Sequence, residues 1–256
     1  MIADQFDAFL LDLDGVLYLG EEPISTAIEA VQRLIESEKT IRVLTNNPRL
    51  PRAALVERFE AAGLAIPESS IVTSGWAAAR FLAQKGIRRA DVVGSAGTVA
   101  ALHAEDIAYT HQQPEAVVVA ADRETTYLDL QRAMQHIEQG ALFVGTNPDT
   151  SFPTPQGRGL GAGAVIKALE AATETSATIV GKPEPLMFDV ALDTLAPNAR
   201  VVMVGDNPKT DIRGARRAGV TSILIADEPH PPDSPADETP DYTMRTLADL
   251  LRQSDT

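Results

Sequence analysis

The stretch Phe9-Leu10-Leu11-Asp12-Leu13-Asp14-Gly15-Val16 joins an apolar run to two carboxylates and a glycine. A short apolar run bounded by turn residues predicts a strand inside a sheet. On a strand, Asp12 and Asp14 would point to the same face and repel each other unless a cation lay between them. Gly15 permits a sharp turn after the acids. Taken alone, the segment is equally consistent with a functional pair of acids around a cation and with a polar strand end that closes in a simple Asp-Gly turn.

Three further segments end strand-like runs in the same way. They are Val43-Leu44-Thr45-Asn46-Asn47, Gly181-Lys182-Pro183 and Val204-Gly205-Asp206-Asn207-Pro208-Lys209-Thr210-Asp211. Each has a plain structural alternative, such as a helix cap at Thr45–Asn47 or a helix N-terminal acid at Asp211. In an open α/β sheet, however, ligands bind where strands end and loops lead into helices. The four segments are therefore predicted to converge on one edge of a sheet.

Apolar strands alternate with amphipathic helices along the whole chain, which predicts an α/β fold with parallel sheets covered on both faces. The predicted strands are Ala8–Leu11, Ile41–Leu44, Ile71–Thr73, Val92–Val93, Ala116–Ala120, Leu142–Val144, Thr178–Val180, Val201–Val204 and Ser222–Ile225. The predicted helices are Ala27–Ser37, Arg52–Ala62, Ala77–Gln84, Leu128–Gln139, Gly163–Ala172, Pro185–Leu195 and Thr210–Ala218.

The stretch between Thr45 and Lys182 carries no matching site segment, although it contains several strands and helices. It is too long to be a loop. The sequence therefore predicts a core domain built from residues 1–75 and 180–256, with an inserted α/β cap domain at residues 76–179.

Composition limits the classes of function. The 256 residues include 36 acids and 22 bases, giving a net charge of −14, and there is no cysteine. Such a surface should repel nucleic acid and anionic membranes, and no disulfide or thiolate metal site can form. No apolar run approaches the roughly 18 residues of a membrane span, and Met1–Asp4 is acidic where a signal peptide would be basic. A cytoplasmic protein is expected.

In their order and spacing, the four segments resemble the haloacid dehalogenase superfamily of phosphohydrolases. The wording of 12–18 (Asp-Leu-Asp-Gly-Val-Leu-Tyr), Thr45–Pro48, Thr146–Asp149 and Gly205–Asn207 is similar to its NagD-like branch, subfamily IIA, which includes the p-nitrophenylphosphatases. The resemblance covers nearly the whole chain. It implies a Rossmann-like three-layer α/β/α core with a parallel sheet, an inserted α/β cap domain, and Mg²⁺ as cofactor. A cluster of carboxylates with no His or Cys also suits Mg²⁺ better than zinc.

The resemblance also implies a role for each site residue. Asp12 is expected to be the nucleophile and Asp14 the general acid and base. Asp12, Asp14 and Asp206 would hold the metal, the second of them through its backbone carbonyl. The remaining residues fall into three groups: Thr45, Asn46 and Lys182 to bind phosphate; Gly15, Asn207 and Asp211 to support the site; and Asn147 and Asp149 in the cap as candidates for substrate selection. A plain Asn-Pro turn is at least as good an interpretation of that cap segment.

The expected function is Mg²⁺-dependent hydrolysis of small phosphate monoesters through an aspartyl-phosphate. Sugar phosphates, nucleotides, phosphoglycolate and glycerol phosphate are candidate substrates, with p-nitrophenyl phosphate as an assay ester. The alternatives are a phosphotransferase or mutase on the same fold, or a catalytically silent binding protein. A homodimer formed through the cap is compatible with the resemblance.

Two other features suggest sites but lack the necessary pattern. The glycine-rich segment Gly157–Gly163 lacks both the spacing and the preceding strand of a dinucleotide-binding loop. The four histidines, His103, His111, His136 and His230, are scattered without ligand spacing and are expected at the surface.

Overall fold

The computed structural model describes residues 1–154, 157–228, 230–231 and 233–252. The chain forms two compact units. The first unit comprises Met1–Thr45, Ala53–Val72 and Lys182–Thr256, and the second comprises Asn46–Arg52 and Thr73–Gly181. The segment Asn46–Arg52, which the sequence pattern left in the core domain, thus belongs to the second unit. That the second unit acts as a cap over substrate remains a prediction.

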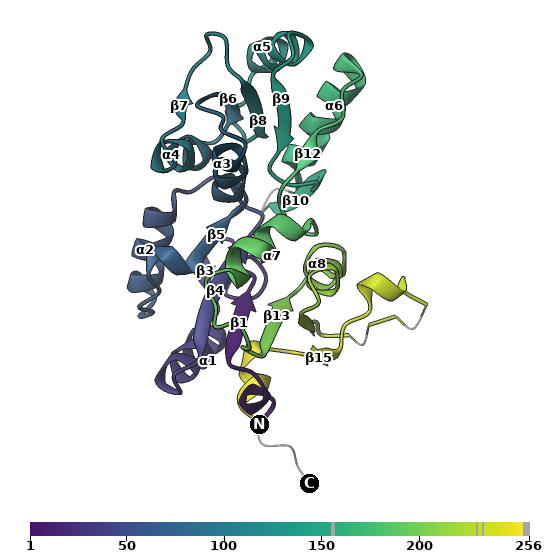
Figure 1. Cartoon of the computed structure of the whole chain (residues 1–256). Helices are drawn as coiled ribbons and strands as arrows, with labels where there is room; N and C mark the ends of the chain where they lie inside the picture. The colour runs from purple at the N-terminus through teal and green to yellow at the C-terminus, as the bar shows by residue number, and fades with distance from the viewer. Residues whose placement is uncertain (155–156, 229, 232, 253–256) are drawn as a thin grey trace. The chain divides into compact units, whose positions relative to one another are not determined.

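The first unit is built on a six-stranded sheet, in the order β15, β14, β13, β1, β4, β5 (Figure 1). The strands are β1 (Ala8–Leu11), β4 (Thr40–Thr45), β5 (Ile71–Thr73), β13 (Val201–Gly205), β14 (Thr221–Ile225) and β15 (Tyr242–Met244). The pairings from β4 through β1, β13 and β14 to β15 are parallel. Read from β5, the chain order is 3-2-1-4-5-6, that of the Rossmann fold, in which the winding reverses between the first and fourth strands. The parallel α/β core predicted from the sequence is confirmed, and its switch point lies between β1 and β13.

Helices cover both faces of this sheet, which is why β1 is buried along its whole length. Phe9 and Leu11 pack with Val31 of α1 (Ser25–Glu36) in one apolar cluster. Leu10, between them, points to the other face. α7 (Pro185–Leu192) and α8 (Arg213–Arg217) pack against each other, and α2 (Arg52–Ala61) adds Leu55 and Phe59 to the α1 cluster.

The second unit has a five-stranded sheet in the order β12, β9, β8, β6, β7, again with parallel pairings. The strands are β6 (Arg89–Gly94), β7 (Ala108–Tyr109), β8 (Ala116–Ala120), β9 (Leu142–Gly145) and β12 (Thr178–Ile179). Read from β7, the chain order is 2-1-3-4-5, the flavodoxin-like order. Val117 and Val119 pack in one cluster with residues of α5 (Tyr127–Glu138) and α6 (Ala162–Thr173), so Val118 faces the opposite side, where α3 (Ser74–Gln84) and α4 (Ala96–Ala104) pack together (Figure 1).

Several short elements differ from the sequence-based expectation. Two antiparallel hairpins, β2–β3 (Tyr18–Leu19, Glu22–Pro23) and β10–β11 (Ser151–Thr154, Gly157–Leu160), were not predicted. The second hairpin corrects the view that no strand precedes the glycine-rich segment. The helix predicted from Thr210 begins instead as a π-helical turn, η3 (Pro208–Ile212), before α8.

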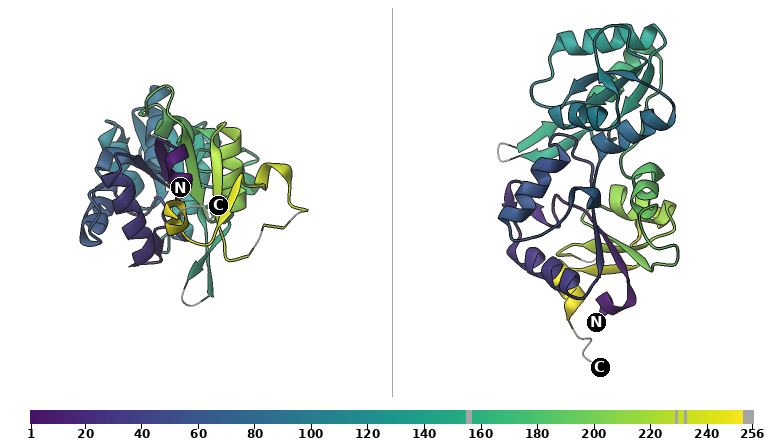
Figure 2. Two further views of the ribbon diagram at one scale, coloured as in Figure 1. Left: turned by 90° about the horizontal axis from the view of Figure 1, so that it is seen from below. Right: turned by 60° about the vertical axis from the view of Figure 1, so that its left-hand side comes forward.

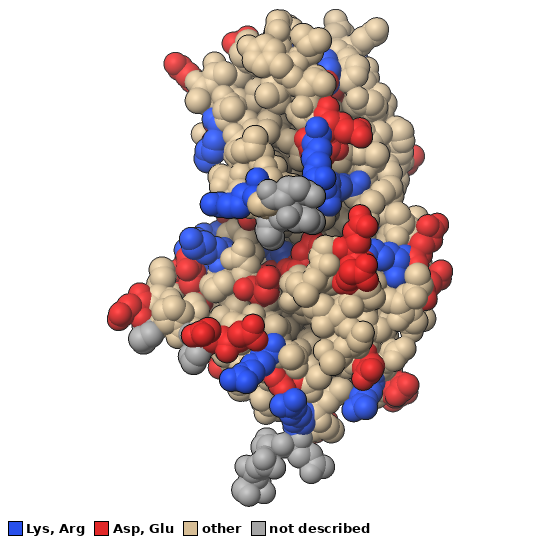
Figure 3. Space-filling model, turned by 180° about the vertical axis from the view of Figure 1, so that it is seen from behind, with Lys and Arg blue, Asp and Glu red and all other residues tan. Residues whose placement is uncertain are grey.

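The remaining helical turns are η1 (Ile2–Gln5), η2 (Glu68–Ser70), η4 (Ala236–Glu238) and η5 (Leu247–Leu251). η1 and η5 lie side by side, which brings the first and last of these helical turns together (Figure 2). None of the helices in the described ranges is both long and apolar enough to span a bilayer. Acidic and basic side chains are interspersed over the face shown in Figure 3.

A buried acid ties three elements of the second unit together. Asp91, in the middle of β6, is fully buried, and its two carboxylate oxygens lie 2.9 Å from Nδ1 of His111 and Nε of Arg132. Nε2 of His136 lies 3.8 Å from the same carboxylate, and only 12% of the His136 side chain is exposed. The surface location expected for His136 is therefore wrong, because its ring closes over this buried charge.

Replacement of Asp91 by alanine should destabilise the second unit by about 3 kcal/mol, because Arg132 would lose a buried partner. Urea unfolding followed by fluorescence measures this unit well, since Trp76, the single tryptophan, lies in α3. Glu138→Ala, at an exposed position on α5, is the control and should cost less than about 0.5 kcal/mol. Equal midpoints for the two variants would contradict the structural role of Asp91.

Candidate active site

The chemically important residues of the first unit stand at the carboxyl ends of its central strands. Asp12 follows the last residue of β1, Thr45 is the last residue of β4, and Asp206 follows the last residue of β13. These strands are neighbours, and β1 and β13 flank the switch point. The predicted convergence of distant segments at one edge of the sheet is therefore observed.

Lys182 lies at the centre of this edge and is 1% exposed. Its Nζ donates to Oδ1 of Asp12 at 2.6 Å, to Oδ1 of Asp211 at 2.6 Å and to the carbonyl oxygen of Leu44 at 2.9 Å. These contacts use the three donors of an ammonium group. They connect the ends of β1 and β4 with η3. The part played by the Leu44 carbonyl has no sequence signal, because every residue offers a backbone oxygen.

The π-helical turn places Asp211 beside Lys182. The second oxygen of Asp211 accepts the backbone N–H of Asn207 at 3.1 Å, and the Asn207 side chain accepts the N–H of Lys209 at 3.0 Å. Gly205 allows this close approach, because a Cβ there would lie 2.2 Å from Cγ of Asp211. π-Turns of this kind occur often at functional sites. Asp211 and Asn207 thus support the site by fixing its loop and its lysine.

The first strand ends before both acids, at the residue where the sequence predicted its end. β1 ends at Leu11, and a turn closed by the N–H of Gly15 and the carbonyl of Tyr18 at 2.7 Å follows. Asp12 is buried whereas Asp14 is exposed. The expectation that both acids share one face of a strand is therefore wrong, because the turn separates their side chains.

Three carboxylates nevertheless gather at one point. Oxygen atoms of Asp12, Asp206 and Asp211 lie within 4.8 Å of one another. Gly15 makes room for them, since it has a φ of +86° and a Cβ there would lie 2.1 Å from Oδ2 of Asp206. Only glycine fits this position without displacing Asp206.

Burial and excess negative charge together shift the pKa values of the cluster. Burial raises the pKa of Asp12 well above its usual value, opposed by Lys182 and reinforced by Asp211 and Asp206. The Asp206 carboxyl, although its residue is exposed overall, loses hydration among its neighbours, and this loss and the charge of Asp211 raise its pKa to about 6. Burial alone would lower the pKa of Lys182, but the charges of Asp12 and Asp211 outweigh burial and raise it. All three shifts would be relieved by a cation.

The cluster fits a hard divalent cation in both composition and charge. It offers only oxygen atoms, which magnesium and calcium prefer. Because Asp211 is engaged by Lys182 and by the Asn207 backbone, Asp12 and Asp206 are the side chains with the capacity to bind a metal.

The other predicted residues come together within the second unit. Nδ2 of Asn46 donates to Oδ2 of Asp149 at 3.0 Å, and the Asn46 carbonyl accepts Nδ2 of Asn147 at 2.9 Å. The same carbonyl accepts the Ser74 hydroxyl at 2.7 Å. The sequence pattern missed Ser74, because a serine between a strand and a helix is ordinarily a local cap. Asn46, Asn147 and Asp149 thus bind one another, whatever else they bind.

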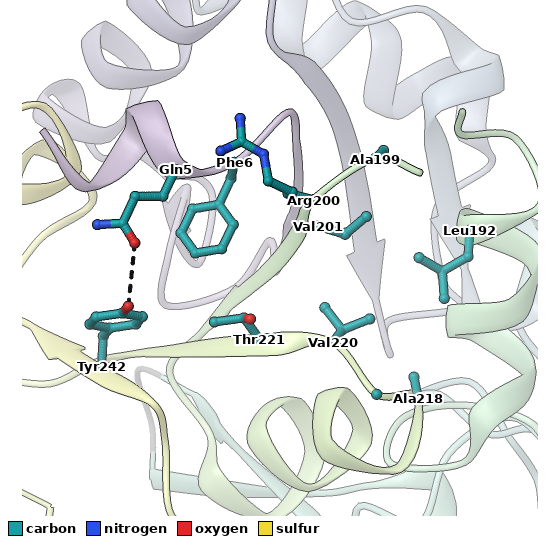
Figure 4. A pocket seen from close by; sticks show the side chains of 11 residues that line it. Gln5, Phe6, Leu192, Ala199, Arg200, Val201, Ala218, Val220, Thr221 and Tyr242 are labelled. Atoms are coloured by element: carbon teal, nitrogen blue, oxygen red, sulfur yellow. Dashed lines mark hydrogen bonds between the residues drawn. The ribbon is translucent and has the colours of Figure 1, made fainter. Parts of the chain in front are cut away.

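A pocket of about 500 Å³ lies at the opposite, amino-terminal edge of the first sheet (Figure 4). Its wall includes Phe6, shortly before β1, and four residues at or near the beginnings of β13, β14 and β15, namely Arg200, Val201, Thr221 and Tyr242. Arg200 is paired with Asp7 at 2.7 Å. This pocket contains none of the residues of the carboxylate cluster and is distinct from the candidate site.

Comparison with known proteins identifies the family of the chain. A family model described as haloacid dehalogenase-like hydrolase matches residues 9–108, and a HAD-hydrolase-like model matches residues 179–250. The dihydroxyacetone phosphatase of Corynebacterium glutamicum is 36% identical over 220 residues, which are 85% of this chain and 80% of that protein. The ribonucleotide monophosphatase NagD of Escherichia coli is 32% identical over 84% of this chain and 86% of its own length.

Solved structures show the same architecture. The p-nitrophenyl phosphatase from Archaeoglobus fulgidus superposes with a TM-score of 0.88 at 28% identity, covering 96% of this chain and 98% of that one. A glycerol phosphate phosphatase from Mycobacterium tuberculosis, solved in complex with magnesium, also gives 0.88 at 27% identity, over 97% of this chain and 77% of that one. With its Rossmann-ordered sheet and this carboxylate edge, the chain belongs to the haloacid dehalogenase-like hydrolases, as a phosphatase of the NagD-like branch.

Proposed function

We propose that this protein is a Mg²⁺-dependent phosphatase that hydrolyses small phosphate monoesters through an aspartyl-phosphate on Asp12. The observation that carries the proposal is the contact of Lys182 with both Asp12 and Asp211 inside a carboxylate cluster. A phosphate dianion could not approach three bare carboxylates. A site that combines acids, one fixed ammonium and room for a cation suits phosphoryl transfer, where catalysis is mainly positioning and charge stabilisation.

Asp12 is the proposed nucleophile. Its contact with Lys182 at 2.6 Å fixes the carboxylate and lowers the cost of keeping it ionised in a buried position. A carboxylate oxygen of Asp12 bonds to phosphorus while the bond from phosphorus to the ester oxygen breaks. When bound by Asp12, Asp206 and the backbone carbonyl of Asp14, Mg²⁺ supplies the positive charge that balances the acids and the phosphoryl oxygens.

Asp14 is the proposed acid and base. Its side chain is exposed, unlike that of Asp12, so it is accessible to the leaving oxygen of an ester that enters from solvent. It gives its proton to the departing ester oxygen as the alcohol leaves. It then accepts a proton from the water that attacks phosphorus, which releases inorganic phosphate and regenerates the carboxylate of Asp12.

The phosphoryl oxygens need donors once the ester is in place. Lys182 provides charge beside Asp12, and Thr45, buried at the end of β4, provides a hydroxyl. The backbone amide of Asn46 is the third proposed donor. These groups act on charge that is spread over the phosphoryl oxygens in the transition state.

The substrate class follows from what the relatives share. Their names specify dihydroxyacetone phosphate, ribonucleotide monophosphates, glycerol phosphate and p-nitrophenyl phosphate, all of them monoesters. The reacting phosphoryl group is constant and the leaving alcohol varies. We therefore assign the phosphoryl chemistry to the first unit and the choice of leaving alcohol to the second.

Hydrolysis of p-nitrophenyl phosphate should require Mg²⁺, stop with EDTA, and fall by more than about 10³-fold in Asp12→Asn, which keeps the shape but loses the nucleophile. Phosphate release should equal nitrophenol release, as hydrolysis requires. Circular dichroism should match between the variant and the wild type. Near-normal turnover by a folded Asp12→Asn protein would contradict the nucleophile assignment.

Gly15→Ala should weaken Mg²⁺ binding by about 10- to 100-fold in calorimetric titration, because the added Cβ would displace Asp206. Gly20→Ala is the matched control. Gly20 also has a positive φ, +61°, but a Cβ there would meet nothing within 4 Å. The control should lose about 1 kcal/mol of stability and keep its Mg²⁺ affinity. Equal loss of affinity in both variants would show that the effect comes from backbone strain and not from Asp206.

A further inference from the structure

Asn46 is the centre of a compact group of residues in the second unit, here called the Asn46 cluster: Asn46, Ser74, Asn147, Asp149 and Gly181. The Asn46 carbonyl accepts two hydrogen bonds, from Ser74 and Asn147, and its side-chain amide donates to Asp149. Asn147 also accepts the N–H of Asp149 at 3.1 Å through Oδ1. Three separate parts of the chain are thus joined at one asparagine.

Glycines let the backbone pack closely around the Asn46 cluster. A Cβ on Gly181 would lie 2.3 Å from the Thr146 carbonyl oxygen and 2.6 Å from Oδ1 of Asn46. On the other side, a Cβ on Gly163 would lie 2.2 Å from the carbonyl oxygen of Pro148. Part of the glycine-rich segment predicted from the sequence therefore serves close packing against the Asn147–Asp149 turn.

The residues after Asn46 are bound just as firmly. The Ser95 hydroxyl donates to the Pro48 carbonyl at 2.7 Å, and the N–H of Gly97 donates to the Arg49 carbonyl at 3.1 Å. A Cβ on Gly97 would lie 2.4 Å from the Pro48 oxygen. The stretch from Asn46 to Arg49 is therefore a fixed part of the second unit, although the chain on both sides of Asn46–Arg52 belongs to the first unit.

The Asn46 cluster contains the chain neighbours of the two side chains proposed to bind phosphate. Asn46 directly follows Thr45, and Gly181 directly precedes Lys182. Adjacent Cα atoms are about 3.8 Å apart, so restraint of Asn46 and Gly181 restrains Thr45 and Lys182 as well. Gly181 also lies close to Oδ1 of Asn46, so the chain neighbours of Thr45 and Lys182 belong to one group of contacts.

We propose that Asn147 and Asp149 are positioning residues, which act through Asn46 on Thr45 and the phosphate site and do not contact the leaving group. The inference rests on the proposed function and deepens it. Both polar ends of Asn147 are occupied by hydrogen bonds, and the residue is only 6% exposed. Turning its amide toward a substrate would leave the partly buried carbonyl of Asn46 with one donor fewer, which is unfavourable.

The test compares wild type with Asp149→Ala, Asp149→Asn and Asn147→Ala. Asp149→Asn retains an oxygen that can accept the Asn46 amide and should rescue much of the function. Glu138→Ala, an exposed acid on α5 of the same unit, is the matched control. Each protein is assayed with p-nitrophenyl phosphate, glycerol phosphate and a nucleoside monophosphate. Binding of inorganic phosphate, which has no leaving group, is measured calorimetrically in Mg²⁺.

Asp149→Ala and Asn147→Ala should lower kcat/KM by about 10- to 100-fold, by the same factor for all three esters, since a displaced phosphate donor affects each of them equally. Inorganic phosphate should bind more weakly in both variants, and Asp149→Asn should lie between the alanine variant and wild type. Glu138→Ala should match wild type in every measurement.

Losses that differ by more than about tenfold between esters, with unchanged phosphate affinity, would overturn the inference and make these residues leaving-group contacts. Unchanged kinetics in both alanine variants would overturn it too. Failure of the proposed function has a different signature, namely a wild-type protein that hydrolyses none of the esters. In that case the phosphate affinities of the variants still decide whether the Asn46 cluster positions the site.

Discussion

A buried ammonium group held between two carboxylates is the constraint on which the first unit depends. Lys182 reaches Asp12, Asp211 and the Leu44 carbonyl from a position that is 1% exposed. An unpaired ammonium in that position would cost several kcal/mol, so the fold is stable only when its partners are in place. Asp12 follows β1, Leu44 lies within β4 and Asp211 belongs to η3. One charge therefore fixes the geometry of three separate segments.

The same arrangement leaves the site with more negative charge than its lysine can balance. Burial raises the pKa of Asp12 and that of Asp206, and the charges of the neighbouring carboxylates raise both further. Oxygen atoms of three carboxylates lie within 4.8 Å of one another, and their repulsion is unfavourable for stability. Functional sites commonly depart from what stability alone would favour. Here the uncompensated carboxylates favour the binding of a cation, and the cation in turn favours an anionic substrate.

Much of this could be predicted from the sequence, because the informative residues are local. The apolar runs at Ala8–Leu11 and Ala116–Ala120 coincide with β1 and β8, since strands buried on both faces must be apolar throughout. Family resemblance correctly identified the fold and the phosphatase class, and it led to the acids at the strand ends. It did so because the chemistry needs those residue types at those positions.

The features that escaped prediction depend on partners far away in the chain. The attachment of Asn46–Arg52 to the second unit comes from Ser95, Gly97 and the Asn147–Asp149 turn. α4 is apolar on all sides and contains Gly97, so it has neither a helical stripe nor an uninterrupted run of helix formers. His136 is partly buried because it packs beside Asp91, on another element, and no spacing in the sequence relates the two.

The stereochemistry at phosphorus would distinguish a covalent mechanism from direct attack by water. An ester made chiral at phosphorus with one sulfur and oxygen isotopes would be hydrolysed by the Mg²⁺-loaded wild-type protein, and the configuration of the released thiophosphate determined. Two in-line displacements, first by Asp12 and then by water, each invert phosphorus and predict overall retention. Overall inversion would mean a single displacement by water, and Asp12 could not then be the nucleophile.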